Sequence, residues 1–255
     1  MIKLKNLLSE LEVGKVLFGE PKGSEWDPRF PDRWSGLDVP FEPNTYDEKK
    51  VLDLIRAWIT KEDNNPKLGE FLKEMLPLKK KFPLILDPIK GRSAYEGNTF
   101  YRGTLLPLND LIYRSGGWKL NNSVDFEYGA IESEIPYTWE AIGQKGFTSF
   151  TPAAETADGF AADYMQKHGM QWTDIVERLQ DGSGMIPVVI TIADTYPNAL
   201  MNPRVMNMIG GLGEYEVFVV GNQIEVKSVI VPNWKFIQEA ADEMGVDLTQ
   251  YFKGL

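Results

Sequence analysis

The stretch EYEVFVVGNQIEVKSVIV, residues 214–231, indicates that the C-terminal half of the chain is built on β-structure. Valine, isoleucine and phenylalanine dominate it, and these side chains favour strands. Gly221 and Asn222 interrupt the apolar run, and both residue types accept the positive φ angles of a tight turn. We therefore predict a β-hairpin with strands over 214–220 and 223–231.

Outward from this stretch, apolar periodicity predicts an α+β core over residues 86–255. We expect one compact unit, in which a mostly antiparallel sheet carries flanking helices. Further strands are predicted over 99–106, 146–151 and 186–192 (IPVVITI), and helices over 139–144, 153–168, 173–179 and 237–244.

The part of the chain before this core predicts helices and irregular segments. Apolar residues recur at helical spacing over 46–61 and again over 66–76. Residues 3–11 predict a short amphipathic helix, whereas 20–46, rich in Pro, Gly, Asp and aromatic residues, predict an irregular segment. We therefore expect a helical and irregular N-terminal region over 1–85.

Composition restricts the functions that the chain can have. Its 255 residues carry a net charge of −10, which repels nucleic-acid phosphates and anionic membrane surfaces. There is no cysteine and one histidine, His168, so thiolate sites are excluded and histidine-based sites are disfavoured. The N-terminus lacks the pattern of a signal peptide, and no apolar run approaches the roughly 20 residues that span a bilayer. We expect a cytoplasmic protein with no membrane partner and no bound metal.

Three short elements carry candidate chemistry, and the first is Tyr101-Arg102-Gly103 in the predicted strand 99–106. A guanidinium binds phosphate or carboxylate groups through paired hydrogen bonds. A glycine beside it lets a ligand approach the backbone closely. Arg102 is therefore a candidate phosphate ligand, and the alternative is an outward-facing arginine on an edge strand.

The second element is the predicted strand 146–151, in which Ser149 and Thr151 would point to the same face. Two hydroxyls on one face of a strand are candidates for holding a polar substrate. The alternative is a strand that runs directly into a helix, with Thr151 as the N-cap and Pro152 at the first helical position.

The third element is the glycine-rich loop 210–213 followed by Glu214 and Glu216. At the two-residue period of a strand the two carboxylates share a face, so their repulsion raises the pKa of one unless a cation compensates. Neither common glycine motif for binding nucleotide phosphates is present. The alternative is ordinary solvated charge at a strand end, which is also how we interpret the acidic stretch 125–134.

In this order and at these spacings, the three elements resemble the mono-ADP-ribosyltransferases of the Arg-Ser-Glu class. That class includes cholera-type toxins, binary actin-modifying toxins and several phage enzymes. The resemblance covers roughly residues 95–232 and implies an ADP-ribosyltransferase-like core, in which a mixed, mostly antiparallel and split sheet carries flanking helices. One position departs from the pattern, because the family's Ser-Thr-Ser triplet is Ser149-Phe150-Thr151 here. The first 85 residues match no motif of the family, and their opening resembles the start of proteins encoded by tailed phages.

The resemblance implies that the chain binds NAD⁺ as its co-substrate and cleaves it between nicotinamide and ribose. Arg102, with Tyr101 beside it, would hold a phosphate of NAD⁺, and the Gly103 backbone would bind the nicotinamide amide. Phe160 would stack on the nicotinamide ring. The alternative for Phe160 is a place in the core of its own helix, beside Ala157.

The resemblance also assigns the catalytic groups. Ser149 would orient Glu216 through a hydrogen bond, and Thr151 would contribute to the same NAD⁺-binding face. Glu216 would hydrogen-bond the ribose 2′-OH and favour an oxocarbenium-like transition state through its charge. Glu214 would bind the acceptor and take its proton. In this family a glutamate at that position implies an arginine acceptor, so the expected partner is a host protein with an exposed arginine.

Three alternatives remain open at this point. An NAD⁺ glycohydrolase, in which water replaces the acceptor, would use the same site. A non-enzymatic binding module associated with a virion or a toxin would keep the fold without the reaction. A nucleic-acid target is opposed by the acidic charge balance.

Overall fold

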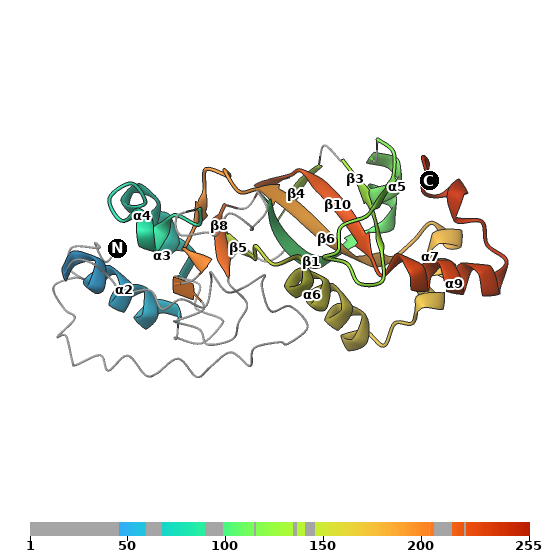
Figure 1. Ribbon diagram of the computed structural model, residues 1–255, viewed down its shortest axis with the longest axis horizontal. Helices are drawn as coiled ribbons and strands as arrows, with labels where there is room; N and C mark the ends of the chain where they lie inside the picture. The colour runs from blue at the N-terminus through green and yellow to red at the C-terminus, as the bar shows by residue number, and fades with distance from the viewer. Residues whose placement is uncertain are drawn as a thin grey trace. The chain divides into compact units, whose positions relative to one another are not determined.

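The computed structural model describes residues 46–59, 68–89, 99–114, 116–134, 137–140, 146–203, 205–206, 216–221 and 223–255. Over these ranges the chain combines helices with antiparallel sheet, in agreement with the predicted α+β class (Figure 1). By packing, it divides into two compact units: unit 1 is 1–98, 141–152 and 194–222, and unit 2 is 99–140, 153–193 and 223–255. The predicted boundary at residue 85 rests on sequence pattern rather than on packing and stays a prediction.

Five antiparallel strands form a sheet in unit 2: β1 (Thr99–Pro107), β2 (Lys119–Asn121), β3 (Ala130–Ser133), β6 (Met185–Ala193) and β10 (Ser228–Pro232). Their order is β1-β6-β10-β3-β2, so that β6 lies between β1 and β10. β6 carries the apolar run predicted as a strand, and its residues from Ile186 to Ile192 are all buried. A continuous apolar run is what a strand covered on both faces requires.

Helix α6 (Ala154–Lys167) packs over β1 and β6 (Figure 1). Its buried face presents small side chains, among them Ala157 and Ala161. A Cβ added at Gly103 of β1 would lie 2.6 Å from the Ala161 backbone nitrogen and 2.9 Å from Phe160 Cβ. The helix therefore approaches the strand to backbone contact, which only a glycine at this position permits.

Two further helices, α7 (Trp172–Asp181) and α9 (Trp234–Met244), pack against each other in unit 2. Local sequence signals set the ends of α7. Gln171 and Asp174 form a capping box before it, and Gly182 follows it in the left-handed conformation. These signals explain why the helix predicted over 173–179 forms.

The remaining elements of unit 2 are short: α5 (Leu108–Arg114), β4 (Tyr137–Glu140), β9 (Gln223–Val226) and the 3₁₀ turn η2 (Leu248–Gln250). β4 and β9 form an antiparallel ladder of their own.

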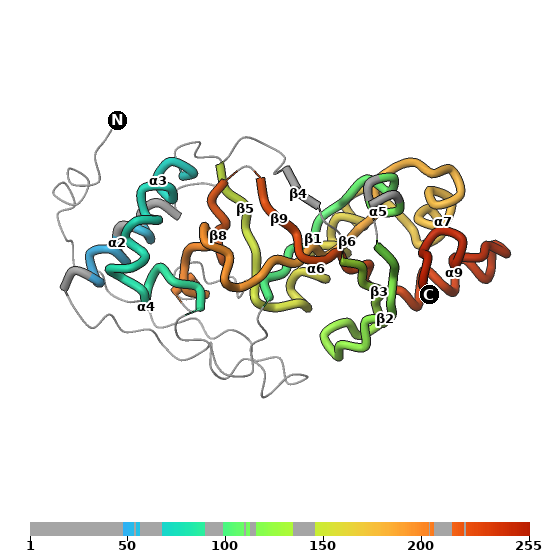
Figure 2. The backbone as a smooth tube through the Cα atoms, turned by 90° about the horizontal axis from the view of Figure 1, so that it is seen from above, coloured from blue at the N-terminus to red at the C-terminus, as the bar shows by residue number. Residues whose placement is uncertain are grey.

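The described residues of unit 1 include a three-stranded antiparallel sheet and several helices that precede it in the chain: β5 (Phe147–Phe150), β7 (Ala199–Leu200), β8 (Val217–Val220), α2 (Tyr46–Ile59), α3 (Leu68–Met75), η1 (Leu76–Leu78) and α4 (Pro83–Leu86). The strand order is β5-β8-β7. One hydrophobic cluster joins helices and sheet, with Ile55, Leu72 and Ile85 from the helices and Leu200 and Phe218 from the strands. Figure 2 shows the three helices grouped together.

The predicted hairpin over 214–231 is wrong. β8 pairs with β5 and β7, β9 pairs with β4, and within the described residues no ladder joins β8 to β9. Between them Gly221 has a φ of 136°, far from the value of about +60° in a tight hairpin turn, so the chain leaves one sheet for another. Every residue of β8 is buried, and the backbone of such a strand needs hydrogen-bond partners on both edges.

Most other predicted elements are confirmed with shifted ends, as α2, α3, β1, β5, α6, α7, β6 and α9 show. The helix predicted over 139–144 is wrong at Trp139 and Glu140, which belong to β4. The N-cap alternative for Thr151 is also wrong, because Ala153 holds that position. Predictions for 3–11, 20–45 and 141–145 lie outside the described residues.

We predict that Gly103→Ala destabilises the protein by about 2–3 kcal/mol, because the new methyl group collides with helix backbone that cannot move aside. Gly159→Ala is the matched control on the exposed side of α6, where nothing lies within 4 Å of the new Cβ. It should stabilise the protein by about 0.5–1 kcal/mol. Urea unfolding of both variants measures these changes, and equal effects would contradict the backbone contact between α6 and β1.

Candidate functional site

The residues predicted to carry chemistry are distributed over both units. Unit 2 contains Tyr101, Arg102, Gly103 and Phe160, and unit 1 contains Ser149, Thr151 and Glu216. Glu214 lies outside the described residues. The residues of each unit are described by themselves.

In unit 1, the pairing of β5 with β8 brings the two hydroxyls and one carboxylate to the same face. Ser149 lies opposite Phe218, and continuation of this register by two residues places Thr151 opposite Glu216. Side chains two residues apart in a strand share a face, and directly opposite residues share it too. Ser149 is therefore a diagonal neighbour of Glu216 across the two strands.

This face of the small sheet changes from apolar to polar along its length. Phe147 and Phe218 pack edge to face, with ring centroids 5.4 Å apart, and both contribute to the cluster beneath the helices. Ser149 and Glu216 are half-buried, and Thr151 is buried. A carboxylate that is partly withdrawn from water acts more strongly on a positive charge than a fully solvated one does.

In unit 2, Arg102 and its two neighbours face opposite sides of the sheet. Arg102 is on β1 and lies opposite Ile190 of β6. β1 is an edge strand within the described sheet. Tyr101 and Gly103 point to the other face, which α6 covers at Gly103. Arg102 is half-buried, so it has the edge position of the alternative interpretation but not the full exposure of a solvated arginine.

Helix α6 accounts for the glycine at position 103. The space that a side chain would take is occupied by helix backbone near Ala157 and Ala161. On this face of β1, the element that closely approaches the Gly103 backbone is helix α6, where the sequence predicted a ligand. Phe160 is 38% exposed, whereas Ala157 and Ala161 are fully buried. The alternative that places Phe160 in the helix core is therefore wrong, and its ring is partly accessible.

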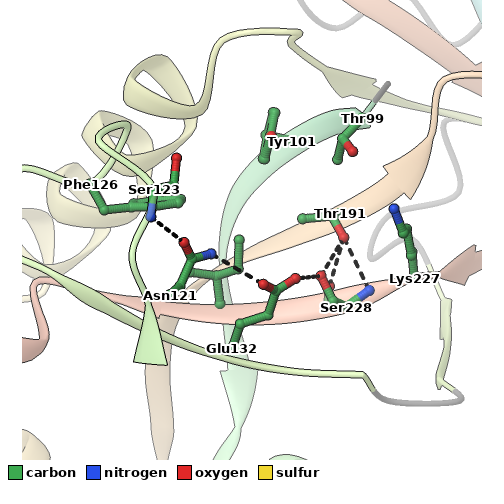
Figure 3. Close-up of a pocket in the computed structure, with 10 residues that line it drawn as sticks. Thr99, Tyr101, Asn121, Ser123, Phe126, Glu132, Thr191, Lys227 and Ser228 are labelled. Atoms are coloured by element: carbon green, nitrogen blue, oxygen red, sulfur yellow. Dashed lines mark hydrogen bonds between the residues drawn. The ribbon is translucent and has the colours of Figure 1, made fainter. Parts of the chain in front are cut away.

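A polar cavity of about 210 Å³ in unit 2 is absent from the sequence predictions (Figure 3). It lies on the same face of the five-stranded sheet as Tyr101. Its walls carry hydroxyl, amide, carboxylate, ammonium and aromatic groups, contributed by Thr99, Tyr101, Asn121, Ser123, Phe126, Glu132, Thr191, Lys227, Ser228 and Ile230.

Strand register places the polar groups of this cavity in a row. Tyr101 lies opposite Thr191, and Thr191 lies opposite Ser228. Ser228 Oγ donates to Glu132 Oε1 at 2.5 Å, and Thr191 Oγ1 lies 2.7 Å from Ser228 Oγ. Asn121 Nδ2 donates to Glu132 Oε2 at 3.2 Å. Glu132 is thus held at both carboxylate oxygens by side chains from two other strands (Figure 3).

The environment of this cavity acts on the Tyr101 phenol. Burial raises the pKa of Tyr101 above its usual value, and the negative charge of Asp125 raises it further. Glu132 and Glu155 add to this effect, while a hydrogen bond with Thr99 acts in the opposite direction. The phenol is therefore neutral at physiological pH and serves as a hydrogen-bonding group with an apolar ring.

The acidic stretch 125–134, interpreted as solvated, is largely buried over 130–133, where it forms β3. The signal that could have found the cavity is a single polar residue inside an apolar strand, such as Thr191 or Ser228. A buried polar side chain needs a partner, so such positions point to a polar network. Which strands lie side by side, and hence which residues join Glu132, depends on contacts between segments far apart in the sequence.

A second half-buried carboxylate, Asp158 on α6, links this helix to the start of α9. Asn233 Nδ2 donates to Asp158 Oδ1 at 2.9 Å, and Asn233 is the left-handed residue, with a φ of 59°, that precedes α9. Burial raises the pKa of Asp158 to about 6. The bond from Asn233 opposes this shift, whereas the charges of Glu155 and Glu127 add to it.

Comparison of the chain with protein-family models, with curated proteins and with solved structures found no match. Among the described residues, no group of three or more His, Asp or Glu side chains is placed to hold a metal ion. None of the helices in the described ranges is long and apolar enough to cross a membrane.

We predict that Asp158→Asn is more stable than the wild type at pH 8, by about 2 kcal/mol, and equally stable near pH 4. The pKa of Asp158 is raised in the folded state, so its contribution to stability is complete below about pH 4 and is lost as the pH rises through about 6. Urea unfolding of both proteins between these pH values gives the difference in free energy.

Asp163→Asn, an exposed substitution on the same helix, is the control and should show no such pH-dependent difference from the wild type. A constant offset between Asp158→Asn and the wild type across the whole range would contradict the burial of a charge at Asp158.

Proposed function

We propose that this chain is a mono-ADP-ribosyltransferase, which transfers ADP-ribose from NAD⁺ to an arginine side chain of a target protein and releases nicotinamide. The observation that carries the proposal is the register of β5 and β8. It sets Ser149 and Thr151 on the face of the sheet to which Glu216 belongs. The Arg-Ser-Glu pattern of the sequence requires this juxtaposition of hydroxyl and glutamate.

The chemistry of NAD⁺ cleavage fits these groups. As the bond from ribose to nicotinamide breaks, positive charge develops on the sugar, and a fixed carboxylate close to it lowers the barrier. Glu216 is the proposed carboxylate, and Ser149 is the proposed positioning residue that holds it. Thr151 lies opposite Glu216 by strand register and is buried, so it would restrict the carboxylate from the other side.

Two features of unit 2 support the binding of NAD⁺. The half-buried Arg102 is suited to a phosphate, because a guanidinium presents paired donors in a fixed geometry. The partly exposed ring of Phe160 offers an aromatic surface on which nicotinamide could stack. Gly103 contributes to NAD⁺ binding in this proposal only through its backbone, since its side-chain position is filled by α6.

The acceptor is proposed from the sequence alone. Glu214 precedes Glu216 by two residues, as in family members that modify arginine. A guanidinium must lose a proton before it can act as a nucleophile, and a carboxylate beside it can bind the cation and accept that proton. The proposed partner is therefore a protein with an exposed arginine.

We predict that Glu216→Gln lowers the rate of nicotinamide release from NAD⁺ by about 100-fold or more, because the neutral amide keeps the shape but removes the charge. Glu225→Gln, an exposed glutamate on β9, is the control and should keep the wild-type rate. Chromatographic quantification of nicotinamide measures both. Equal NAD⁺ consumption by the wild type and Glu216→Gln would contradict the proposal that Glu216 acts in NAD⁺ cleavage.

We predict that Glu214→Ala abolishes transfer to protein while part of the NAD⁺ hydrolysis remains, because water needs no carboxylate to bind as the acceptor. The measurement compares label from radioactive NAD⁺ in the proteins of a bacterial lysate with free ADP-ribose in the same reaction. Equal loss of both activities contradicts the role of Glu214. Hydrolysis by the wild type with no labelled protein would instead assign the chain as an NAD⁺ glycohydrolase.

A further inference from the structure

The polar cavity of unit 2 has features of a built binding site that the proposed transfer reaction does not use. Its groups come from all five strands of the sheet and lie on the face opposite to Arg102. Tyr101, Thr191 and Ser228 stand in register, and Glu132 extends the row through its bond from Ser228. Figure 3 shows Tyr101 and Thr99 across the cavity from Glu132.

The hydrogen bonds that reach Glu132 have fixed directions, because a carboxylate can only accept, and they leave its carboxylate oriented. Ser228 N donates to Thr191 Oγ1 at 3.0 Å, and Ser228 Oγ donates to Glu132. Thr191 then donates its own hydroxyl proton to Ser228, either to Oγ at 2.7 Å or to the backbone carbonyl oxygen at 3.3 Å, and the bond from Ser228 Oγ ends the row on the carboxylate. Each carboxylate oxygen can accept two hydrogen bonds and receives one from the protein in this network. Counting the donors among the described residues, two acceptor positions on neighbouring oxygens remain for a ligand.

The cavity also contains donors. Asn121 uses its amide oxygen to accept from Ser123 N at 2.9 Å and one amide N–H to bind Glu132. Within the part of the chain that the structure describes, its second amide N–H is therefore left as a donor. Lys227 lines the cavity from the bend between β9 and β10. A ligand that satisfies this site must therefore donate two neighbouring hydrogen bonds and accept others. Hydroxyl groups do both, whereas a guanidinium can only donate and a phosphate can only accept.

Charge and shape narrow the class of ligand further. Asp125, Glu132 and Glu155 surround Tyr101 with negative charge, which disfavours an anionic ligand, while Lys227 disfavours a cationic one. The rings of Tyr101 and Phe126 supply an apolar wall for the C–H face of a ring. A volume of about 210 Å³ is below the roughly 300 Å³ at which pockets for drug-sized ligands begin.

We propose that this cavity binds the vicinal diol of an uncharged sugar ring, with Glu132 accepting both hydroxyls and with Asn121 and Lys227 as donors. The diol is that of a free sugar or that of a nucleoside ribose, which share this chemistry. The proposal goes beyond the transfer reaction and does not rest on it. The cavity would recognise a glycan or a nucleoside through residues other than those assigned to NAD⁺ cleavage.

The test measures binding of methyl β-D-ribofuranoside and of adenosine to the full chain by isothermal titration calorimetry. Each is compared with its 2-deoxy counterpart, which lacks the vicinal diol. We expect both diols to bind and each deoxy compound to bind about 10-fold more weakly or worse, because it leaves a carboxylate acceptor unsatisfied. Tighter binding of adenosine than of the riboside identifies a nucleoside as the source, and equal binding identifies a free sugar.

Glu132→Gln removes one acceptor and the charge at nearly constant shape, and should weaken diol binding about 10-fold or more. Glu134→Gln, an exposed position two residues away, is the matched control and should bind as the wild type does. If circular dichroism shows that Glu132→Gln does not fold, Lys227→Met is the second test, because Lys227 is exposed and its replacement should leave the fold intact. We expect Lys227→Met to weaken diol binding severalfold.

The proposal would be overturned by no diol binding up to the solubility limit, by equal affinity for diol and deoxy compound, or by unchanged binding in the folded cavity variants. Binding of arginine amide in place of the diols would overturn it as well. These probes contain neither nicotinamide nor phosphate, so failure here leaves the proposed transferase untouched. Loss of ADP-ribose transfer in the earlier experiments likewise leaves the diol site to be judged on its own.

Discussion

Backbone contact between α6 and β1 at Gly103 is the constraint on which unit 2 depends. Because no side chain fits there, the helix lies directly on the sheet over one row of residues. The next row on the same face lies two residues further along each strand, outside this contact. That row includes Thr191 and Ser228, is polar and opens into a cavity. The same helix position leaves the ring of Phe160 at the surface and Asp158 against Asn233.

Elements whose signals are local could be predicted from the sequence. The run IPVVITI predicts a strand because seven apolar or β-branched residues in succession suit burial on both faces, and 46–61 predicts a helix from its 3.6-residue period. Partners of strands could not be predicted in the same way. Gly221-Asn222 permits a hairpin turn but does not require one, and the burial of β8 on every residue selects β5 and β7 instead.

The same distinction between local signals and contacts of distant segments applies to the candidate site. The family pattern singled out Ser149 and Glu216, and strand register sets them on one face although they are far apart in the chain. Tyr101 was grouped with Arg102 as its neighbour, yet the two-residue period of a strand alone separates them onto opposite faces. Glu132 could not have been found by spacing, because its partners come from strands whose order in the sheet is set by the fold as a whole.

The alternation of the two units along the chain has a consequence for how the protein is made. The chain passes between the units at residues 98, 140, 152, 193 and 222. Strand β8 completes the small sheet and the cluster with α2 and α3, so unit 1 is incomplete until residue 220 has left the ribosome. Contacts of such large sequence separation slow folding, and until they form the apolar faces of α2 and α3 are open to aggregation. Neither unit can be excised as one continuous segment. Because segments of the two units alternate along the chain, neither unit is synthesised separately from the other.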